Sequence, residues 1–464
     1  MGHFYVKALF SLFSLLFLIL SVRIVWSALR GLWPKLARQN CLRTESWWRL
    51  AFRLALGCTY VLFTSLWLIQ VHPVLHIESH PFYDPELHQW HLLDQDGSPE
   101  DAAVVKKLDR ITRAFFKSHK VQSTPVGICM GAVYKNRTFV FSAGHVAIES
   151  DVTPDAGTLF EIGSITKVFT GHALAHCVEQ KLVALDDPLS SLLSDWKIPD
   201  NQITLKALAT HHSGLPNFGE LLRHTLKAFL SMKEPGISYS YLTDAESRAY
   251  LAGFRSRAIS FRYSNFGVGL LGFALARKVN MNYEEMVRQF ICEPIGMQDT
   301  HVQVAEGGNR TAQGYLGPLR FGPLSLVIRA DANACTNVYE GAAGLRSTVK
   351  DMLRYIKANI AAPKGPAGND LTRMQGPIAE TTIENSRIGL CLMIKDARYK
   401  DPVYWHSGAT KGFHSYLAFS KEHAIGVVML ANGCVDDDIA KQVLNALTGF
   451  RSHDSVIPSF RQRP

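Results

Sequence analysis

The chain has 464 residues, of which 47% are hydrophobic and 19% charged. This composition is that of a folded protein, and the length allows one large domain with additional segments. The net charge of +9 is concentrated near the N-terminus, because the chain up to Arg53 carries eight Lys or Arg residues against Glu45 alone. The rest of the chain is nearly neutral, which excludes a typical nucleic-acid-binding domain.

Two apolar stretches open the chain, at residues 8–29, interrupted by Arg23, and at residues 54–69. The uninterrupted runs are close to the lower limit for a membrane-spanning helix, about 17 residues. Basic residues fill the loop between them, whereas residues 54–105 contain no Lys or Arg. The positive-inside rule therefore predicts a multi-pass membrane anchor over residues 1–71 with a cytoplasmic basic loop. The alternative is that the first stretch is a cleaved signal peptide.

This orientation places the remainder of the chain outside the cytoplasm, in the periplasm if the protein is bacterial. Residues 72–101 contain five clustered histidines and several prolines. The prolines argue against one rigid helix that would present the histidines together, so we expect a solvated juxtamembrane linker rather than a metal site. A globular domain follows over residues 102–450, and residues 451–464 form a tail.

Within the globular domain, strand patterns occur at both ends and helical patterns occupy the middle. This order predicts an α+β fold in which the N-terminal hairpin pairs with the C-terminal strands. The expected elements are a helix at 102–119, a hairpin of 126–134 with 138–143, a mostly helical region at 160–359, strands at 388–395, 403–409, 413–419 and 424–431, and a helix at 437–448.

Ser-x-x-Lys occurs three times, at Ser164–Lys167, Ser194–Lys197 and Ser347–Lys350. The motif supports chemistry when the serine and the lysine lie one turn apart on a helix, because the amine then reaches the hydroxyl. Only the first motif opens a long predicted helix. Pro199 shortens the second, and the third is typical of an N-capping serine before a surface helix. Ser164 is therefore the predicted nucleophile.

Two further motifs accompany it. Tyr263-x-Asn265 lies where a loop enters a Gly-rich helix, a position that can aim a catalytic side chain. His406-Ser407-Gly408 lies on a predicted strand, whose backbone N–H groups can stabilise an oxyanion or bind an extended substrate. Second copies of both motifs fall in predicted turns, at residues 134–136 and 212–214.

In this order, the motifs resemble those of the class C β-lactamases and the penicillin-recognising DD-peptidases. The resemblance extends over about 102–450 and includes the segments around them. These segments are Phe-Glu-Ile-Gly-Ser-Ile-Thr-Lys from Phe160, Leu-Ala-Thr-His-His-Ser-Gly-Leu-Pro from Leu208, Glu-Pro-Ile-Gly-Met from Glu293, Ala-Ala-Gly-Leu-Arg-Ser-Thr from Ala342 and His-Ser-Gly-Ala-Thr-Lys-Gly-Phe from His406.

The resemblance implies a five-stranded antiparallel sheet flanked by helices, with a helical subdomain and the active site between them. It implies that Ser164, Lys167 and Tyr263 are catalytic, with either Lys167 or Tyr263 as the base. Asn265 and residues 406–408 would bind substrate, and the N–H groups of Ser164 and Ala409 would form the oxyanion hole. No metal or cofactor is implied.

Two features depart from the family pattern. Many class C β-lactamases carry lysine where this chain has His406, and no Glu-x-x-Leu-Asn segment supplies a deacylating glutamate. If His406 reads a substrate carboxylate, we expect KM for such substrates to improve as the pH falls from about 8 to 6, through the reference pKa of histidine.

The sequence thus predicts an extracytoplasmic serine hydrolase that forms an acyl-enzyme with small-molecule or peptide substrates carrying an amide or ester. The alternative is a catalytically idle ligand-binding or sensor protein that uses the same pocket.

Overall fold

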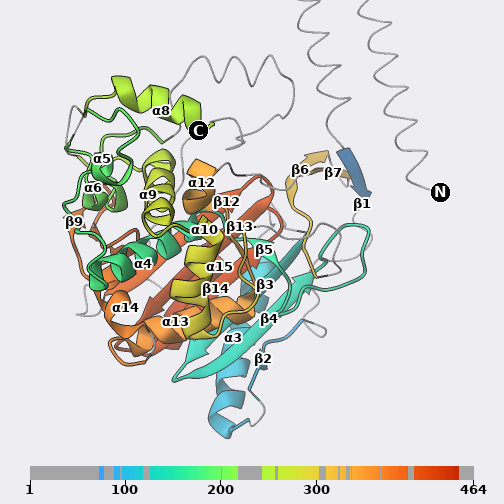
Figure 1. Ribbon diagram of the computed structural model, residues 1–464. Helices are drawn as coiled ribbons and strands as arrows, with labels where there is room; N and C mark the ends of the chain where they lie inside the picture. Colours follow the sequence, from blue (N-terminus) through green and yellow to red (C-terminus); the bar gives the residue numbers. More distant parts are fainter. Residues whose placement is uncertain are drawn as a thin grey trace, which may run out of the picture.

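The computed structural model describes residues 73–77, 88–94, 97–118, 126–199, 201–217, 243–256, 260–302, 310–321, 324–330, 335, 337–365, 367–395 and 402–448 (Figure 1). The two predicted membrane-spanning segments and the predicted tail lie outside these residues. Among the helices that are described, none has both the length and the apolar character needed to cross a membrane.

The predicted hairpin is confirmed as strands β3 (Gly127–Tyr134) and β4 (Arg137–Gly144), which pair in antiparallel register. Lys135 and Asn136 form its two-residue turn, with φ angles of 48° and 69°. Two successive left-handed residues match the right-handed twist of the strands on either side, as in a type I′ turn. This local geometry explains why the hairpin was visible in the sequence.

The central sheet is fully antiparallel among the described strands, and the N-terminal hairpin joins the C-terminal strands, as predicted, where β3 pairs with β14. Five long strands form most of it: β4, β3, β14 (Ile425–Ala431), β13 (Phe413–Ser420) and β12 (Val403–Thr410). Short strands extend it on both sides: β2 (His91–Leu92), β11 (Met393–Lys395), β10 (Ser386–Ile388) and β9 (Ala379–Glu380).

The expected five-stranded sheet is therefore wrong in its count, because the described sheet has nine strands in the order β2-β4-β3-β14-β13-β12-β11-β10-β9. The four additional strands have only two or three residues each, too few for an alternating pattern to show. The single strand expected at 388–395 divides into β10 and β11, and Cys391 between them has a φ of 57°.

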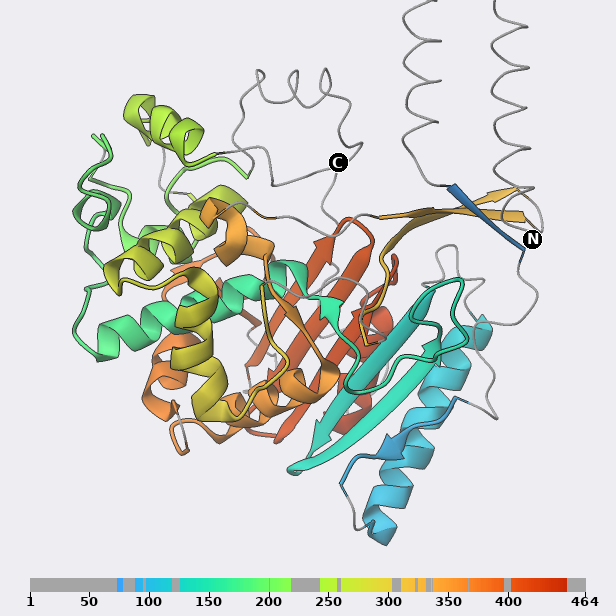
Figure 2. The same cartoon turned by 45° about the vertical axis from the view of Figure 1, so that its right-hand side comes forward.

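Alternate residues of the central strands enter separate hydrophobic clusters, as the period of two requires. Ile128, Met130 and Ala132 pack with helices α3 (Pro99–Ser118) and α15 (Asp438–Thr448). Cys129 and Val133 belong to the cluster that contains helix α13 (Val349–Ala361). The sheet is thus covered by helices on both faces, and α3 is seen clearly outside the β3–β4 hairpin in Figure 2.

A helical subdomain lies beside the sheet, where Figure 1 shows α5, α6, α8 and α9 gathered together. Its centre is the crossing of α9 (Asn265–Lys278) with α12 (Asn337–Ala343). A Cβ at Gly269 would lie 2.3 Å from the Val338 carbonyl oxygen, and one at Gly272 would lie 2.9 Å from the Gly341 Cα. Glycines at this crossing let the two backbones approach closely, which holds the start of α9 in place.

The end of the predicted linker is not solvated, contrary to expectation. Strand β2 pairs with β4, and Trp90 is only 2% exposed. The Trp90 backbone N–H donates to Asp109 Oδ1 at 2.8 Å, and its indole N–H donates to Thr112 Oγ1 at 3.2 Å. Earlier in the same segment, β1 (Pro73–Ile77) pairs with β7 in a three-stranded sheet.

The remaining described elements connect these parts. They are β5 (Phe160–Glu161), η1 (Gly163–Ile165), α4 (Thr166–Glu179), α5 (Leu189–Leu192), α6 (Leu205–Ala209), α8 (Asp244–Gly253), α10 (Tyr283–Val287), η3 (Arg288–Cys292), α11 (Glu293–Ile295), β6 (Tyr315–Phe321), β7 (Leu324–Arg329), β8 (Arg346–Ser347) and α14 (Gly368–Gln375).

Candidate active site

Ser164 lies in the short helix η1, which runs directly into α4, the helix that carries Lys167. Lys167 Nζ is 2.8 Å from Ser164 Oγ and 2.8 Å from the carbonyl oxygen of Ala342. Ser164 is 7% exposed and Lys167 is fully buried. The three-residue spacing therefore brings amine and hydroxyl into direct contact, which is the geometry that the first Ser-x-x-Lys motif predicted.

Burial lowers the pKa of the Lys167 amine to about 7. The low dielectric disfavours the ammonium form, and no carboxylate partner compensates within the described part of the site. The ring of Tyr263 lies 5.2 Å from Nζ, measured to the ring centroid. A large fraction of Lys167 is consequently neutral near pH 7, and a neutral amine can accept a proton from Ser164.

The other two Ser-x-x-Lys motifs do not form comparable pairs. Ser194 is exposed and follows the short helix α5. Ser347 belongs to β8, and its hydroxyl hydrogen-bonds that of Thr300 at 2.9 Å. The capping role expected for Ser347 falls instead to Thr348, whose side chain accepts from the Asp351 N–H.

A pocket of about 140 Å³ opens in front of Ser164. It brings together most of the residues that the sequence motifs singled out, because β12 runs alongside η1 and the loop before α9 faces both. Its lining consists of Ser164, Tyr263, Met393, Trp405, His406, Ser407, Gly408, Ala409, His414 and Asp437.

Close backbone contact between η1 and β12 shapes the predicted oxyanion hole. Gly163 has a φ of +49°, and a Cβ there would lie 2.8 Å from the Ala409 backbone nitrogen. A Cβ at Gly408 would lie 2.2 Å from the Ile162 carbonyl oxygen and 3.0 Å from the Ser164 nitrogen. Only glycine fits either position. The N–H groups of Ser164 and Ala409 are therefore held on adjacent backbone segments at the pocket.

His406 does not behave as the sequence suggested. Burial, together with the nearby Lys167, lowers the pKa of its imidazole to about 3. Its Nδ1 is 2.6 Å from the Ser407 carbonyl oxygen, which can only accept, so Nδ1 carries the hydrogen in the neutral ring. The low pKa argues against the expected improvement of KM between pH 8 and 6 through His406, and that expectation stays a prediction.

Asn265 lies beneath the pocket and does not line it. It begins α9, it is 1% exposed, and its side-chain amide donates to Asn217 Oδ1 at 2.7 Å. The preceding Ser264 caps the helix by accepting from the Gly267 N–H at 2.8 Å. In this arrangement Asn265 fixes the loop that presents Tyr263, and its predicted contact with substrate stays a prediction.

Sequence reasoning missed His211, a buried histidine beside Tyr263. Their ring centroids are 4.4 Å apart, and His211 Nδ1 accepts the Ser264 N–H at 3.1 Å. Nε2 must then carry the hydrogen, and it has no hydrogen-bond partner among the described residues. Burial, with Lys167 and His406 nearby, lowers the pKa of His211 well below its usual value. The doubled histidine before Ser213 was the signal, but it was interpreted as part of a turn.

His414 and Asp437 were missed as well. His414 Nε2 is 2.6 Å from Asp437 Oδ1, and both residues line the pocket. They are separated by 23 residues in the chain, so no local motif could connect them.

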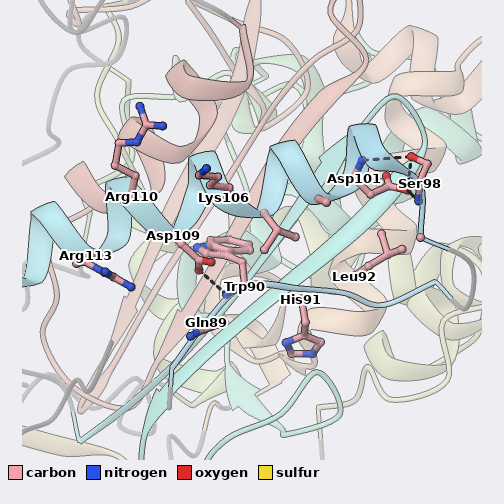
Figure 3. A pocket seen from close by; sticks show the side chains of 13 residues that line it. Gln89, Trp90, His91, Leu92, Ser98, Asp101, Lys106, Asp109, Arg110 and Arg113 are labelled. Carbon is pink, nitrogen blue, oxygen red and sulfur yellow. Dashed lines mark hydrogen bonds between the residues drawn. The ribbon is translucent and has the colours of Figure 1, made fainter. Parts of the chain in front are cut away.

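A larger cavity, of about 770 Å³, lies between α3 and residues 89–92, 97 and 98 (Figure 3). The Ser98 hydroxyl there donates to the Asp101 carboxylate at 2.8 Å, whereas the Ser164 hydroxyl contacts a buried lysine amine. By volume alone this cavity would be the candidate active site, but the serine in contact with a lysine amine lies in the smaller pocket. Within the described chain, no group of three or more His, Cys, Asp or Glu side chains is placed to hold a metal ion.

Comparison with known proteins agrees with the geometry. The sequence model of the Beta-lactamase family matches residues 111–449. A β-lactamase of Lysobacter lactamgenus is 23% identical over 378 residues, which cover 73% of this chain and 90% of that protein. The D-alanyl-D-alanine-carboxypeptidase/endopeptidase AmpH of Escherichia coli (strain K12) is 25% identical over 328 residues, or 66% of this chain and 80% of that protein.

Solved structures show the same fold. A class C β-lactamase superposes with a TM-score of 0.63 at 18% sequence identity, covering 78% of this chain and 99% of that chain. Another, from Rhodobacter sphaeroides, has a TM-score of 0.59 at 18% identity, covering 74% of this chain and 99% of that chain. With the family match spanning well over half of the sequence, the chain belongs to the β-lactamase family of serine hydrolases, which includes the class C β-lactamases and related DD-peptidases.

Proposed function

We propose that this protein is a membrane-anchored, extracytoplasmic serine hydrolase that cleaves amides or esters through an acyl-enzyme on Ser164. The observation that carries the proposal is the 2.8 Å contact between Ser164 Oγ and the buried amine of Lys167. A neutral amine in contact with a hydroxyl at the mouth of a pocket is the arrangement that nucleophilic catalysis requires.

In the first step, Lys167 accepts the Ser164 hydroxyl proton while Oγ attacks the substrate carbonyl carbon. The carbonyl π electrons move to oxygen, and the N–H groups of Ser164 and Ala409 stabilise the resulting oxyanion. When the tetrahedral species collapses, the bond to the leaving nitrogen or oxygen breaks. The leaving group takes the proton from the Lys167 ammonium, and an ester on Ser164 remains.

In the second step, a base takes a proton from water while the water oxygen attacks the acyl carbon of this ester. The bond between that carbon and Ser164 Oγ then breaks, Oγ receives the proton from the base, and the carboxylic acid leaves. Either Lys167 or Tyr263 serves as the base. The Tyr263 ring is packed against His211 and faces the Lys167 amine, so both groups lie within the same small volume. For this second step, the base stays open between these two residues.

The membrane part of the proposal rests on the charge pattern. The basic loop between the apolar stretches favours a cytoplasmic location for the loop and an extracytoplasmic location for the hydrolase domain. β-Lactams and peptides are candidate substrates, since relatives are named β-lactamases and a D-alanyl-D-alanine-carboxypeptidase/endopeptidase.

The alternative is a catalytically idle ligand-binding protein, which would not require the buried amine of Lys167. Burying an amine is unfavourable, and here the desolvation lowers its pKa to about 7. A pocket that only binds ligands gains nothing from this arrangement beside a serine hydroxyl.

The proposal is tested by labelling the purified full-length protein with a fluorophosphonate probe. We expect the wild type and Ser194→Ala to be labelled and Ser164→Ala to remain unlabelled, with mass spectrometry locating the adduct on the peptide that contains Ser164. Ser194 is the matched control because it belongs to an exposed copy of the same motif. A folded wild type without any adduct would favour the idle pocket.

A further inference from the structure

The pair His414–Asp437 forms one wall of the pocket that contains Ser164. His414 lies on β13 opposite Ala409 of β12, and Asp437 immediately precedes α15. Their side chains meet at 2.6 Å, and their exposed fractions are 23% and 9%. The sheet and the C-terminal helix thus bring a carboxylate to the place where substrate must pass.

The charge of the lining is unusual for a site that receives anions. Among the described residues that line it, none is Lys or Arg, and Asp437 is the one carboxylate. The remaining side chains include the apolar surfaces of Met393 and Trp405. His406 adds no positive charge, because burial holds its pKa at about 3.

Lys167, which contacts Ser164 but does not line the pocket, does not change this balance. Lys167 lies behind Ser164, fully buried, and its amine contacts the Ser164 hydroxyl and the Ala342 carbonyl oxygen. His414 is already paired with Asp437, so a charge on its ring would at most neutralise that carboxylate. A substrate carboxylate entering the pocket would lose water without gaining a cationic partner among the described lining residues, and it would face Asp437.

We propose that this pocket selects substrates whose group next to the reacting carbonyl is uncharged or cationic, and that Asp437 is the specificity-determining residue that excludes carboxylates. The proposal rests on the proposed acyl-enzyme function and names its substrate class. Among the candidate substrates of the proposed function, it favours uncharged amides and esters over β-lactams and C-terminal peptides, which carry a free carboxylate.

The test uses three 4-nitrophenyl esters with the same acyl chain, ending in a carboxylate, a carboxamide or a trimethylammonium group. Their kcat/KM values are measured with full-length protein at pH 8 and low ionic strength. We expect the carboxylate ester to be worse than the carboxamide by about tenfold or more, and the trimethylammonium ester to equal or exceed it. Raising the salt concentration should narrow the differences.

Asp437→Asn should raise the ratio of carboxylate to carboxamide turnover by about tenfold, because it removes the charge and keeps the shape. Asp438→Asn is the matched control. Asp438 is the next residue, it pairs with Lys441 at 3.0 Å, and it does not line the pocket, so the ratio should not change.

A wild-type preference for the carboxylate ester would overturn the proposal, as would equal shifts in both variants. If Asp437→Asn does not fold, the wild-type ranking and its salt dependence decide. If Ser164 hydrolyses the carboxamide ester but the carboxylate ester is hydrolysed faster, the proposed selectivity is overturned and the proposed acyl-enzyme function stands. Absence of all three activities together with absence of Ser164 labelling would overturn the proposed function, and this inference with it.

Discussion

Lys167 is the residue whose ionisation should control the rate. Burial lowers its pKa to about 7, so the neutral form that can accept a proton increases as the pH rises through 7. Of the two histidines beside it, His406 has a pKa lowered to about 3 and His211 has one lowered well below its usual value. Neither adds an ionisation step between pH 6 and 8.

We therefore predict that kcat/KM for an uncharged ester falls by about tenfold for each pH unit below 7 and levels off above pH 8. Lys167→Arg should lower kcat/KM by about a hundredfold or more, because a guanidinium cannot deprotonate. Initial rates between pH 5 and 9 check both statements. A wild-type profile that is flat across pH 7 would contradict the assignment of Lys167 as the base.

At the scale of elements, the position of α4 depends on contact with the chain before β11. A Cβ at Gly171 would lie only 2.0 Å from the Leu390 carbonyl oxygen. This neighbour is backbone and cannot rotate away. One turn of α4 separates Gly171 from Lys167, so any displacement of the helix also displaces the amine from Ser164.

Gly171→Ala should therefore lower the free energy of unfolding by about 1–3 kcal/mol through overpacking, although alanine is the better helix former. The control is Gly253→Ala at the end of α8, where an added Cβ meets nothing within 4 Å. That change should leave stability unaltered or raise it by up to about 1 kcal/mol. Urea unfolding of both variants gives the comparison, and equal stability would show that α4 can shift without loss.

For the whole molecule, the open question is its orientation relative to a membrane. A fusion after Pro464 should be active with a reporter that works only outside the cytoplasm. An insertion near Asn40 should be active with a reporter that works only inside, because the basic loop is retained there. The measurement is the activity of both types of reporter at each of the two positions. Cytoplasmic activity of the C-terminal fusion would refute the orientation.

Local sequence patterns were sufficient to predict much of the fold of this protein. The turn at Lys135 and Asn136 and the continuous apolar runs of β3 and β14 are set by neighbouring residues, and so both could be predicted from the sequence. Ser164 could be chosen over Ser194 and Ser347 because its motif begins a long helix, whereas Pro199 shortens the helix of the second motif and Ser347 was expected to cap the helix that follows it. The short edge strands could not be predicted, because two or three residues are held in a sheet by their neighbours and not by their own pattern.

The chemical properties of the site depended on tertiary structure. His406 was correctly expected on a strand, but its low pKa results from burial next to Lys167, which no local pattern encodes. His211 can be recognised as part of the site only from the packing of its ring against Tyr263. Asp437 meets His414 only because α15 folds back over the sheet. The family, the pairing of Ser164 with Lys167 and most of the long elements followed from the sequence alone, whereas the low pKa of His406 and the pairing of His414 with Asp437 arise from contacts between segments far apart in the chain.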